Sequence, residues 1–283
     1  MLYPNLPSLW KGNRQRSQES EASSQKKAKG YTCGMKITIA ATVEEMGQQA
    51  ADDGAEILCK AIESKGSANL ILATGASQFT VLDALLTDPF ITWNKVTIFH
   101  LDEYLGLPPS HGASFRKYLW ERFVSQLPVP PAAVHWIDGE SQPEVECHRL
   151  SLIIMKHPID LAFIGIGENG HLAFNDPPAD FNTNNPYIVV QLDEACRKQQ
   201  LGEGWFPTFE AIPQQAISMS INHIMKSQHI ICSVPDERKA IAVKNAVEGS
   251  VTNQVPASIL QKHQSMTLYL DVHSAKLLSR SSQ

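Results

Sequence analysis

The stretch from Ile159 to Pro178, IDLAFIGIGENGHLAFNDPP, constrains the fold more than any other part of the chain. It begins with an apolar run that suits a buried strand and is too short for a membrane span. Three glycines then break the strand and allow tight turns and close backbone approach to a ligand. Asn169, His171 and Asp176 follow directly. Because ligands of open α/β sheets bind beyond the carboxyl ends of the strands, His171 and Asp176 are candidates for proton transfer.

Two other interpretations of this stretch stay open at this point. GIGENG matches the G-x-G-x-x-G fingerprint of dinucleotide-binding folds, but that fingerprint should open a long helix. Pro177 and Pro178 stop any helix within about two turns, since proline removes a backbone donor and clashes with the preceding turn. Nicotinamide or flavin binding is therefore disfavoured. The stretch can also be a solvated glycine loop with an incidental histidine.

The length and composition of the chain indicate one folded domain. A chain of 283 residues can bury one large core, and 43% hydrophobic with 19% charged residues is ordinary for globular proteins. The net charge of -5 argues against nucleic acid as the main partner, although a local cationic pocket can still bind a small anion. No apolar run approaches about 18 residues, so we expect no transmembrane helix and no membrane partner.

The N-terminal segment and the cysteines bear on where the protein resides. Residues 1–34 are polar and poor in apolar residues, so we expect a disordered extension ahead of a domain spanning residues 35–283. The extension lacks the apolar core of a signal peptide. The cysteines are odd in number and scattered, which indicates reduced thiols in a cytoplasmic protein and disfavours a zinc site. They are Cys33, Cys59, Cys147, Cys196 and Cys232.

Strand-like and helix-like patterns alternate from Met35 onward. A helix is expected from the N-cap Thr42, with Glu45 completing a capping box, to about Ser64. The alternation predicts a single-domain α/β fold with a mainly parallel, Rossmann-like sheet and helices on both faces. Strands are expected at residues 36–40, 69–73, 95–101, 133–137, 161–166, 187–192, 216–221, 229–234 and 266–270.

Three further strand ends carry polar chemistry. The turn Thr74-Gly75-Ala76-Ser77 precedes a helix, where backbone N–H groups and hydroxyls suit a phosphate; a simple capped turn is the alternative. Asp102 and Glu103 follow the strand KVTIFHL, so one carboxylate can act as a general base while the other pairs elsewhere. An acidic surface turn is the alternative there. Lys239, near the start of a later helix, is either a phosphate ligand or a solvated lysine.

Taken together, these residues resemble the glucosamine-6-phosphate deaminase (isomerase) family, which shares its fold with the 6-phosphogluconolactonases. The continuation AFN after Gly170-His171 favours the deaminase branch, because a lactonase is expected to carry an SLFP-like sequence there. The matching segments occur in order over about residues 35–273: LATGAS at 72–77, FHLDEYLGL at 99–107, GIGENGHLAFNDP at 165–177, RKA at 238–240 and SIL at 258–260.

The resemblance implies an enzyme that converts glucosamine 6-phosphate and water to fructose 6-phosphate and ammonia. It implies that the enzyme needs no metal and no cofactor, and that its partner is a phosphorylated amino sugar. It leaves open whether the protein forms a homo-oligomer. Asp102 matches the base that moves a proton from C2 to C1, and His171 matches the residue that opens the sugar ring. Asn169 and Asp176 match the groups that assist this histidine. The substrate-binding positions are then Thr74, Gly75, Ala76, Ser77, Gly167 and Lys239.

The sequence also departs from the family pattern. Asp176 stands where Glu is familiar, Asn169 stands where Asp is frequent, and the phosphate turn reads GASQ in place of GGTP. An arginine that helps to hold phosphate in relatives is displaced, and Arg197 is the nearest candidate. No Lys or Arg occurs from residue 172 to residue 196, so we predict that regulation by a second phosphosugar is absent.

Two alternatives to a deaminase follow from the same resemblance. A sugar-phosphate lactonase would hydrolyse an ester without a base for C2. A catalytically idle sugar-phosphate sensor should carry a helical DNA-binding module, and residues 1–34 are too short and too polar to supply one.

Overall fold

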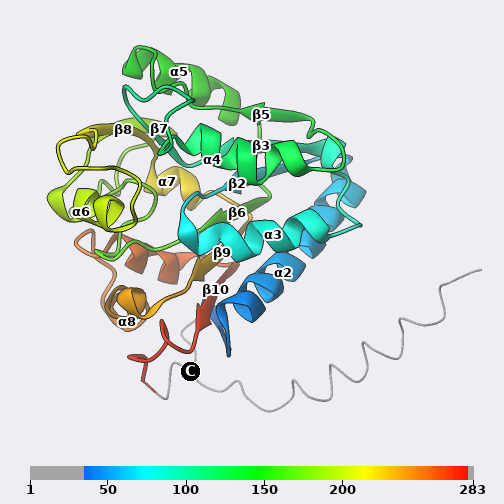
Figure 1. The fold of residues 1–283 in the computed structure, drawn as a ribbon. Helices are drawn as coiled ribbons and strands as arrows, with labels where there is room; N and C mark the ends of the chain where they lie inside the picture. Colours follow the sequence, from blue (N-terminus) through cyan, green and yellow to red (C-terminus); the bar gives the residue numbers. More distant parts are fainter. Residues whose placement is uncertain (1–34, 280–283) are drawn as a thin grey trace, which may run out of the picture. The chain divides into compact units, whose positions relative to one another are not determined.

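The computed structural model describes residues 35–279, which contain a seven-stranded sheet with helices on both faces (Figure 1). All six neighbouring pairs of strands are parallel, which confirms the predicted fold class. The order across the sheet is β1 (Met35–Ala40), β10 (Met266–Asp271), β9 (His229–Val234), β6 (Leu161–Ile164), β2 (Ala68–Leu72), β3 (Val96–His100) and β5 (Ala133–His135).

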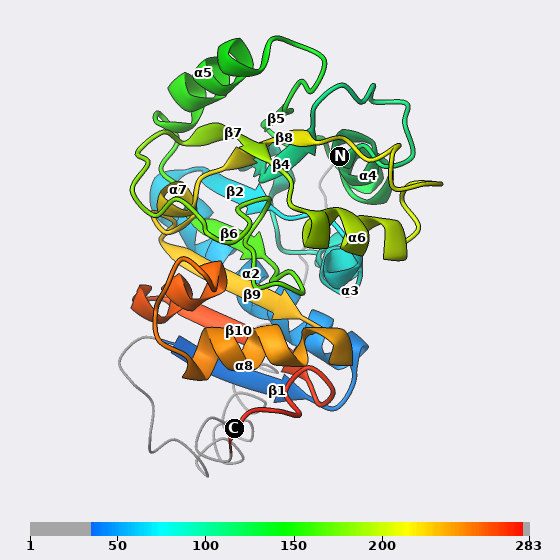
Figure 2. The same cartoon turned by 90° about the vertical axis from the view of Figure 1, so that its left-hand side faces the viewer.

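The central strand β6 shows why the sheet needs helices on both faces. Leu161 and Phe163 pack into a core with the helices of one face, whereas Ala162 and Ile164 pack into the core of the opposite face. Successive side chains of a strand point to opposite faces, so a continuous apolar run must be covered twice. Figures 1 and 2 show α2 and α8 on the two sides of the sheet.

The remaining elements divide between the two faces and the connections. The first face carries α2 (Val43–Lys65), α3 (Phe79–Thr87) and α4 (Phe115–Arg122). The second carries α5 (Pro143–Ile154), α7 (Ile221–Ile224), α8 (Ala240–Glu248) and the 3-10 helix η5 (Pro256–Lys262). The connections contain α6 (Glu194–Gly202) and the 3-10 helices η1 (Ala76–Gln78), η2 (Trp93–Lys95), η3 (Val124–Gln126) and η4 (Glu237–Lys239).

The start of α2 agrees with the sequence prediction. Thr42 Oγ1 accepts a hydrogen bond from Glu45 N at 3.1 Å, and Glu45 Oε2 accepts one from Ala41 N at 2.9 Å. The two side chains therefore satisfy backbone donors that the first turn leaves free. The helix ends at Gly66, whose φ of 81° suits glycine.

A second sheet of three antiparallel strands lies beside the first. Its order is β4 (Asp102–Tyr104), β8 (Gln215–Met219) and β7 (Tyr187–Gln191). The strands predicted at residues 187–192 and 216–221 exist, but they pair with each other antiparallel and not with the main sheet. No strand was predicted at β4, because three residues are too few to show an alternating pattern.

The prediction of a disordered extension at residues 1–34 lies outside the described residues. Among residues 35–279, no helix combines the length and the apolar character that crossing a bilayer requires.

Candidate active site

The four central strands of the main sheet each deliver one predicted site segment to a single cavity. The strands β9, β6, β2 and β3 are direct neighbours, and their carboxyl ends lead to Lys239, His171, the Thr74–Ser77 turn and Asp102. All of these line a cavity of about 290 Å³, as does Gly167. Asn169 and Asp176 contact His171 without lining the cavity themselves. The parallel sheet therefore brings together segments that are up to 165 residues apart.

Asp102 is held in place through its backbone. It begins β4, where it lies opposite Ser218 of β8. The Nε2 atom of His100 accepts a hydrogen bond from Ile137 N at 2.9 Å, so its Nδ1 carries the proton and donates to Asp102 O at 3.0 Å. Burial lowers the pKa of His100 to about 3, which keeps this tautomer neutral. His100 thus fixes the backbone that carries the Asp102 carboxyl group.

The Asp102 side chain has the properties of a general base in a buried position. It is only 6% exposed and lines the cavity. Burial raises the pKa of Asp102 well above its ordinary value of 3.8, and the charge of Glu103 raises it further. A carboxylate that binds a proton more readily is a better acceptor for a weakly acidic C–H proton at neutral pH.

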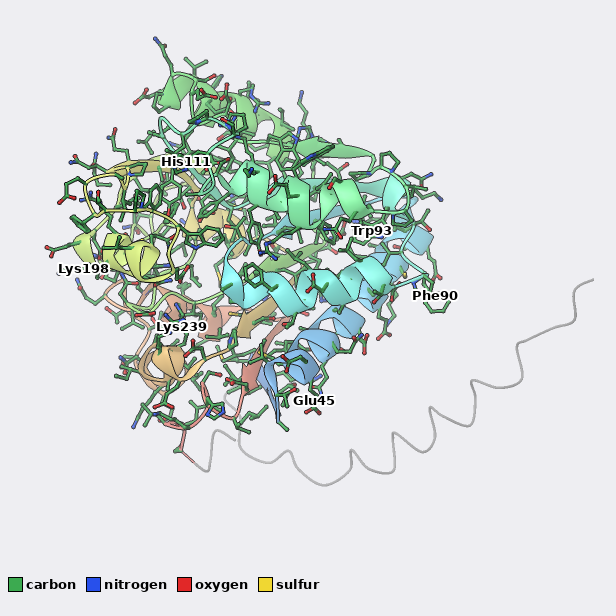
Figure 3. The ribbon with its side chains drawn as sticks, in the orientation of Figure 1. Glu45, Phe90, Trp93, His111, Lys198 and Lys239 are labelled. Carbon is green, nitrogen blue, oxygen red and sulfur yellow. The ribbon has the colours of Figure 1, made fainter. Side chains whose placement is uncertain are left out.

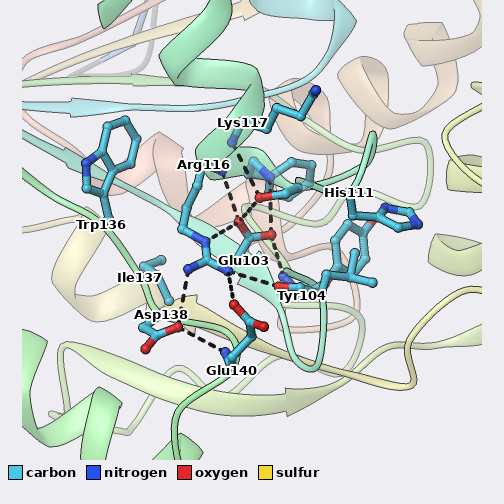
Figure 4. Close-up of polar contacts among 12 residues, drawn as sticks. Glu103, Tyr104, His111, Arg116, Lys117, Trp136, Ile137, Asp138 and Glu140 are labelled. Carbon is cyan, nitrogen blue, oxygen red and sulfur yellow. Dashed lines mark hydrogen bonds and ion pairs between the residues drawn. The ribbon is translucent and has the colours of Figure 1, made fainter. Parts of the chain in front are cut away.

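Glu103 points away from the cavity and has a structural task. Its carboxylate accepts hydrogen bonds from Ser114 Oγ at 2.8 Å, Phe115 N at 3.2 Å and Arg116 N at 3.0 Å, which caps the first turn of α4 (Figure 4). The guanidinium of Arg116 adds an ion pair at 3.4 Å and reaches Asp138 at 3.2 Å. The two adjacent carboxylates therefore face different partners, as the sequence predicted.

The loop after β6 is compact because of its glycines, and it opens no helix, which agrees with the case against a dinucleotide fingerprint. Gly167 N donates to His171 O at 3.0 Å, and Gly170 adopts a φ of 84°. A Cβ atom at Gly167 would lie 2.2 Å from the His171 ring, so only glycine leaves room for the imidazole. The glycines thus hold the histidine at the cavity wall.

A polar cluster lies behind His171. Its Nδ1 atom lies 3.1 Å from Asp176 Oδ1, although this contact is not aligned as a hydrogen bond. Asn169 donates through Nδ2 to Asp176 Oδ1 at 3.0 Å and accepts from His171 N at 3.1 Å. Asp193 N donates to the other Asp176 oxygen at 3.1 Å. The shorter Asp176 therefore reaches the imidazole directly, and Asn169 orients both groups.

The ionisation of Asp176 follows from these contacts. Burial alone would raise the pKa of Asp176, but the interactions with His171, Asn169 and the Asp193 backbone outweigh burial and hold it below the ordinary value. Asp176 is therefore a carboxylate at neutral pH, and a carboxylate beside an imidazole stabilises the imidazolium form.

The opposite end of the cavity suits an anion. Gly75 has a φ of 96°, and its carbonyl accepts a hydrogen bond from Tyr118 Oη at 2.9 Å, which holds the Thr74–Ser77 turn. Lys239 is only 7% exposed and forms no ion pair with any described residue (Figure 3). Burial lowers the pKa of Lys239. A buried cation without a counterion favours an anionic ligand.

The wall formed by α6 and the following turn was not predicted. Gln199 Nε2 donates to Glu203 Oε1 at 2.8 Å, and Trp205 Nε1 donates to Glu203 Oε2 at 3.1 Å. These three residues line the cavity together with Gln200 and Arg238. Their segment contains no spacing typical of a site. The RKA motif was the one signal that could have pointed to Arg238.

Arg197 does not take the place of the displaced arginine. Its guanidinium donates to the backbone carbonyls of Phe209 at 2.9 Å and Ile212 at 3.0 Å, and it lies over the Phe209 ring, 4.1 Å from the ring centroid. It does not line the cavity. Arg238 lies there instead, paired with Asp236 at 2.8 Å and Glu168 at 3.6 Å.

Comparison with known proteins identifies relatives over most of the chain. The sequence profile of the family described as glucosamine-6-phosphate isomerases/6-phosphogluconolactonase matches residues 41–269. A glucosamine-6-phosphate deaminase of Geobacillus sp. (strain WCH70) is 36% identical over 249 residues, which cover 86% of this chain and 96% of the relative. Glucosamine-6-phosphate deaminase 2 of Bacillus subtilis (strain 168) is 37% identical over 255 residues, with 88% and 99% covered.

Solved structures give the same picture for the fold. A monomeric glucosamine-6-phosphate deaminase superposes with a TM-score of 0.79 and 30% identity, covering 86% of this chain and 100% of that one. A 6-phosphogluconolactonase from Thermotoga maritima has a TM-score of 0.69 at 17% identity, covering 84% and 99%. The lactonase likeness therefore concerns the fold alone.

Proposed function

Because the chain belongs to the family of glucosamine-6-phosphate isomerases and 6-phosphogluconolactonases, we propose that it converts glucosamine 6-phosphate and water to fructose 6-phosphate and ammonia. Deaminases at 36% and 37% identity over most of the chain support this choice within the family. The observation that carries the proposal is that Asp102 and His171 line one cavity together with Lys239, a buried cation with no ion-pair partner among residues 35–279.

Binding of the substrate begins with its phosphate. Lys239 supplies a positive charge from a buried position, where the attraction to a dianion is stronger than in bulk solvent. The turn Thr74–Ser77 supplies hydroxyl and backbone donors. Arg238 lies next to Lys239 on the cavity wall. The sugar then extends from this end toward Asp102 and His171.

His171 opens the pyranose ring. Its imidazole takes the proton from the O1 hydroxyl and returns a proton to O5 as the C1–O5 bond breaks, which gives the open-chain aldehyde. Asp176 stabilises the imidazolium that forms between the two transfers, and Asn169 keeps Asp176 and the loop backbone in position.

Asp102 carries out the isomerisation. Its carboxylate takes the proton from C2 while O1 takes a proton from the ammonium group of the substrate, which gives an enolamine, and the Asp102 carboxylic acid then delivers its proton to C1. The product is an iminium at C2; water adds to this carbon, ammonia leaves, and fructose 6-phosphate remains. The raised pKa of Asp102 favours the first transfer, because C2–H is a weak acid.

The test is an assay of purified protein with glucosamine 6-phosphate, its galacto epimer and 6-phosphogluconolactone. We expect ammonia and ketose phosphate in equal amounts from an amino sugar phosphate. Lactone hydrolysis without ammonia would overturn the proposal in favour of a lactonase. Binding of all three compounds without turnover would favour the sensor.

A further inference from the structure

A thiol that the proposed reaction does not use lies against the catalytic histidine. Cys196, in the first turn of α6, is 1% exposed. One donor atom each from Cys196, His171 and Asp176 lie within 4.8 Å of one another, and no other such group of three or more His, Cys, Asp or Glu residues occurs within residues 35–279. The three come from two separate segments of the chain, so spacing in the sequence could not reveal the cluster.

A second observation concerns the imidazole. The Nδ1 atom of His171 is buried and has no aligned hydrogen-bond partner among the described residues, even though Asp176 lies 3.1 Å away. Asp176 Oδ1 and Oδ2 already accept from Asn169 and Asp193 N, which leaves the carboxylate with further acceptor capacity. The cluster thus brings together a ring nitrogen without an aligned hydrogen bond, a carboxylate oxygen and a sulfur.

We propose that Cys196 Sγ, His171 Nδ1 and Asp176 bind Zn²⁺ or a similar borderline-soft divalent cation, and that the bound ion reversibly inhibits the enzyme. The set of one sulfur, one nitrogen and one oxygen donor suits zinc, and three protein ligands leave the fourth tetrahedral position for one further ligand. The inhibitory part of this inference rests on the proposed function; the binding part does not.

The chemistry of binding explains the inhibition. The metal forms a bond with the thiolate, and the thiol proton leaves to solvent. The neutral imidazole uses its Nδ1 lone pair for the metal and keeps its proton on Nε2. His171 can then no longer accept the O1 proton, and the ring stays closed.

The binding experiment needs no substrate. Chelator-treated full-length protein is titrated with Co²⁺, and thiolate-to-cobalt charge-transfer absorption is followed, with Zn²⁺ as competitor. We expect one equivalent to saturate the band. Cys196→Ser should remove the charge-transfer band and weaken Zn²⁺ binding by at least about tenfold. Cys59→Ser is the control and should behave as the parent protein, because Cys59 lies in α2 and is not part of the cluster.

Activity supplies the second readout. Zn²⁺ should inhibit ammonia release by the parent protein, a chelator should restore it, and Cys196→Ser should retain activity but resist inhibition. Retained activity also shows that this variant folds. An unchanged cobalt spectrum in Cys196→Ser, or no thiolate band in the parent protein, would overturn the inference. Absence of ammonia release with an intact cobalt spectrum would instead overturn the proposed function alone.

Discussion

The two ends of the cavity are built in opposite ways. At the proton-transfer end, His171, Asn169 and Asp176 contact one another, and the backbone of Asp102 is fixed by His100. At the anion end, Lys239 is buried without an ion-pair partner among the described residues. The first end is organised before the substrate arrives, whereas the second obtains its counterion from the substrate. Catalysis needs fixed geometry, and binding needs an unsatisfied charge.

Both ends nevertheless share one energetic property. Burial raises the pKa of Asp102 and lowers the pKa of Lys239, so the charged form of each group is disfavoured in the free folded protein. Each therefore reduces the free energy of unfolding relative to a neutral side chain of similar size. Variants can therefore separate function from stability: a neutral replacement of either residue should lower activity and raise the free energy of unfolding.

The largest effect is expected from Asp102→Asn. The amide keeps the size of the side chain but cannot take a proton from C2, so kcat should fall by about 10²- to 10⁴-fold. Substrate should still protect the variant against thermal unfolding, because the anion end is intact. The measurement is kcat together with exchange of solvent deuterium at C2. Normal exchange in the variant would refute the role of Asp102.

The next effect concerns the anion end. Lys239→Met should raise KM by about ten- to a hundredfold, the range that corresponds to losing one charge-assisted hydrogen bond, while kcat changes less. The free variant should unfold at a higher temperature than the parent protein. The matched control is Lys198→Met, since Lys198 lies on the exposed side of α6 and pairs with Glu194 at 2.5 Å (Figure 3). Equal KM values for both variants would contradict the assignment.

Glu103→Gln should have a smaller effect, and this effect should be on stability and not on activity. The amide loses two of the hydrogen bonds that cap α4 and leaves Arg116 without its fully buried partner, which should reduce the free energy of unfolding by about 1–3 kcal/mol. Urea unfolding gives this value. A large loss of kcat with unchanged stability would show that the two neighbouring carboxylates have exchanged tasks.

The smallest effect is a dependence on pH. The pKa of Asp102 lies well above 3.8 in the folded protein and near 3.8 in the unfolded chain, so the folded state binds more protons between these values. Ionisation of Asp102 therefore lowers the free energy of unfolding as pH rises through this interval. Below pH 3.8 the side chain is protonated in both states, and this effect vanishes. The excess stability of Asp102→Asn over the parent protein should grow with pH in urea unfolding. A constant difference would show an ordinary pKa.

The sequence predicted the fold well because its strands are buried on both faces. The strands β2, β3, β6, β9 and β10 are mostly apolar and mostly buried, which leaves few alternatives to a parallel sheet covered by helices. The small antiparallel sheet escaped prediction. Its strand β4 has only three residues. No local sequence pattern indicates that Asp102 pairs with Ser218, which is 116 residues away.

Prediction of the site followed the same division. Residues that end a buried strand could be assigned to one edge of the sheet, and eight of the ten predicted positions line the cavity. The wall containing Gln199, Glu203 and Trp205 could not be foreseen, because its place depends on long-range contacts such as Glu168 N donating to Gln199 Oε1 at 3.1 Å. The suggestion that Arg197 helps to hold the phosphate was wrong, because the sequence does not determine the direction of its side chain, which donates to the Phe209 carbonyl.

The order of the strands has a consequence for biosynthesis. The cavity requires β2, β3, β6 and β9, which span residues 68–234, and then Lys239. A nascent chain that ends after the loop that follows β6 contains Asp102 and His171 but lacks Lys239, and without β9 one edge of β6 has no neighbouring strand. Truncated transcripts or proteolytic fragments that end before Lys239 should therefore yield no partly active enzyme.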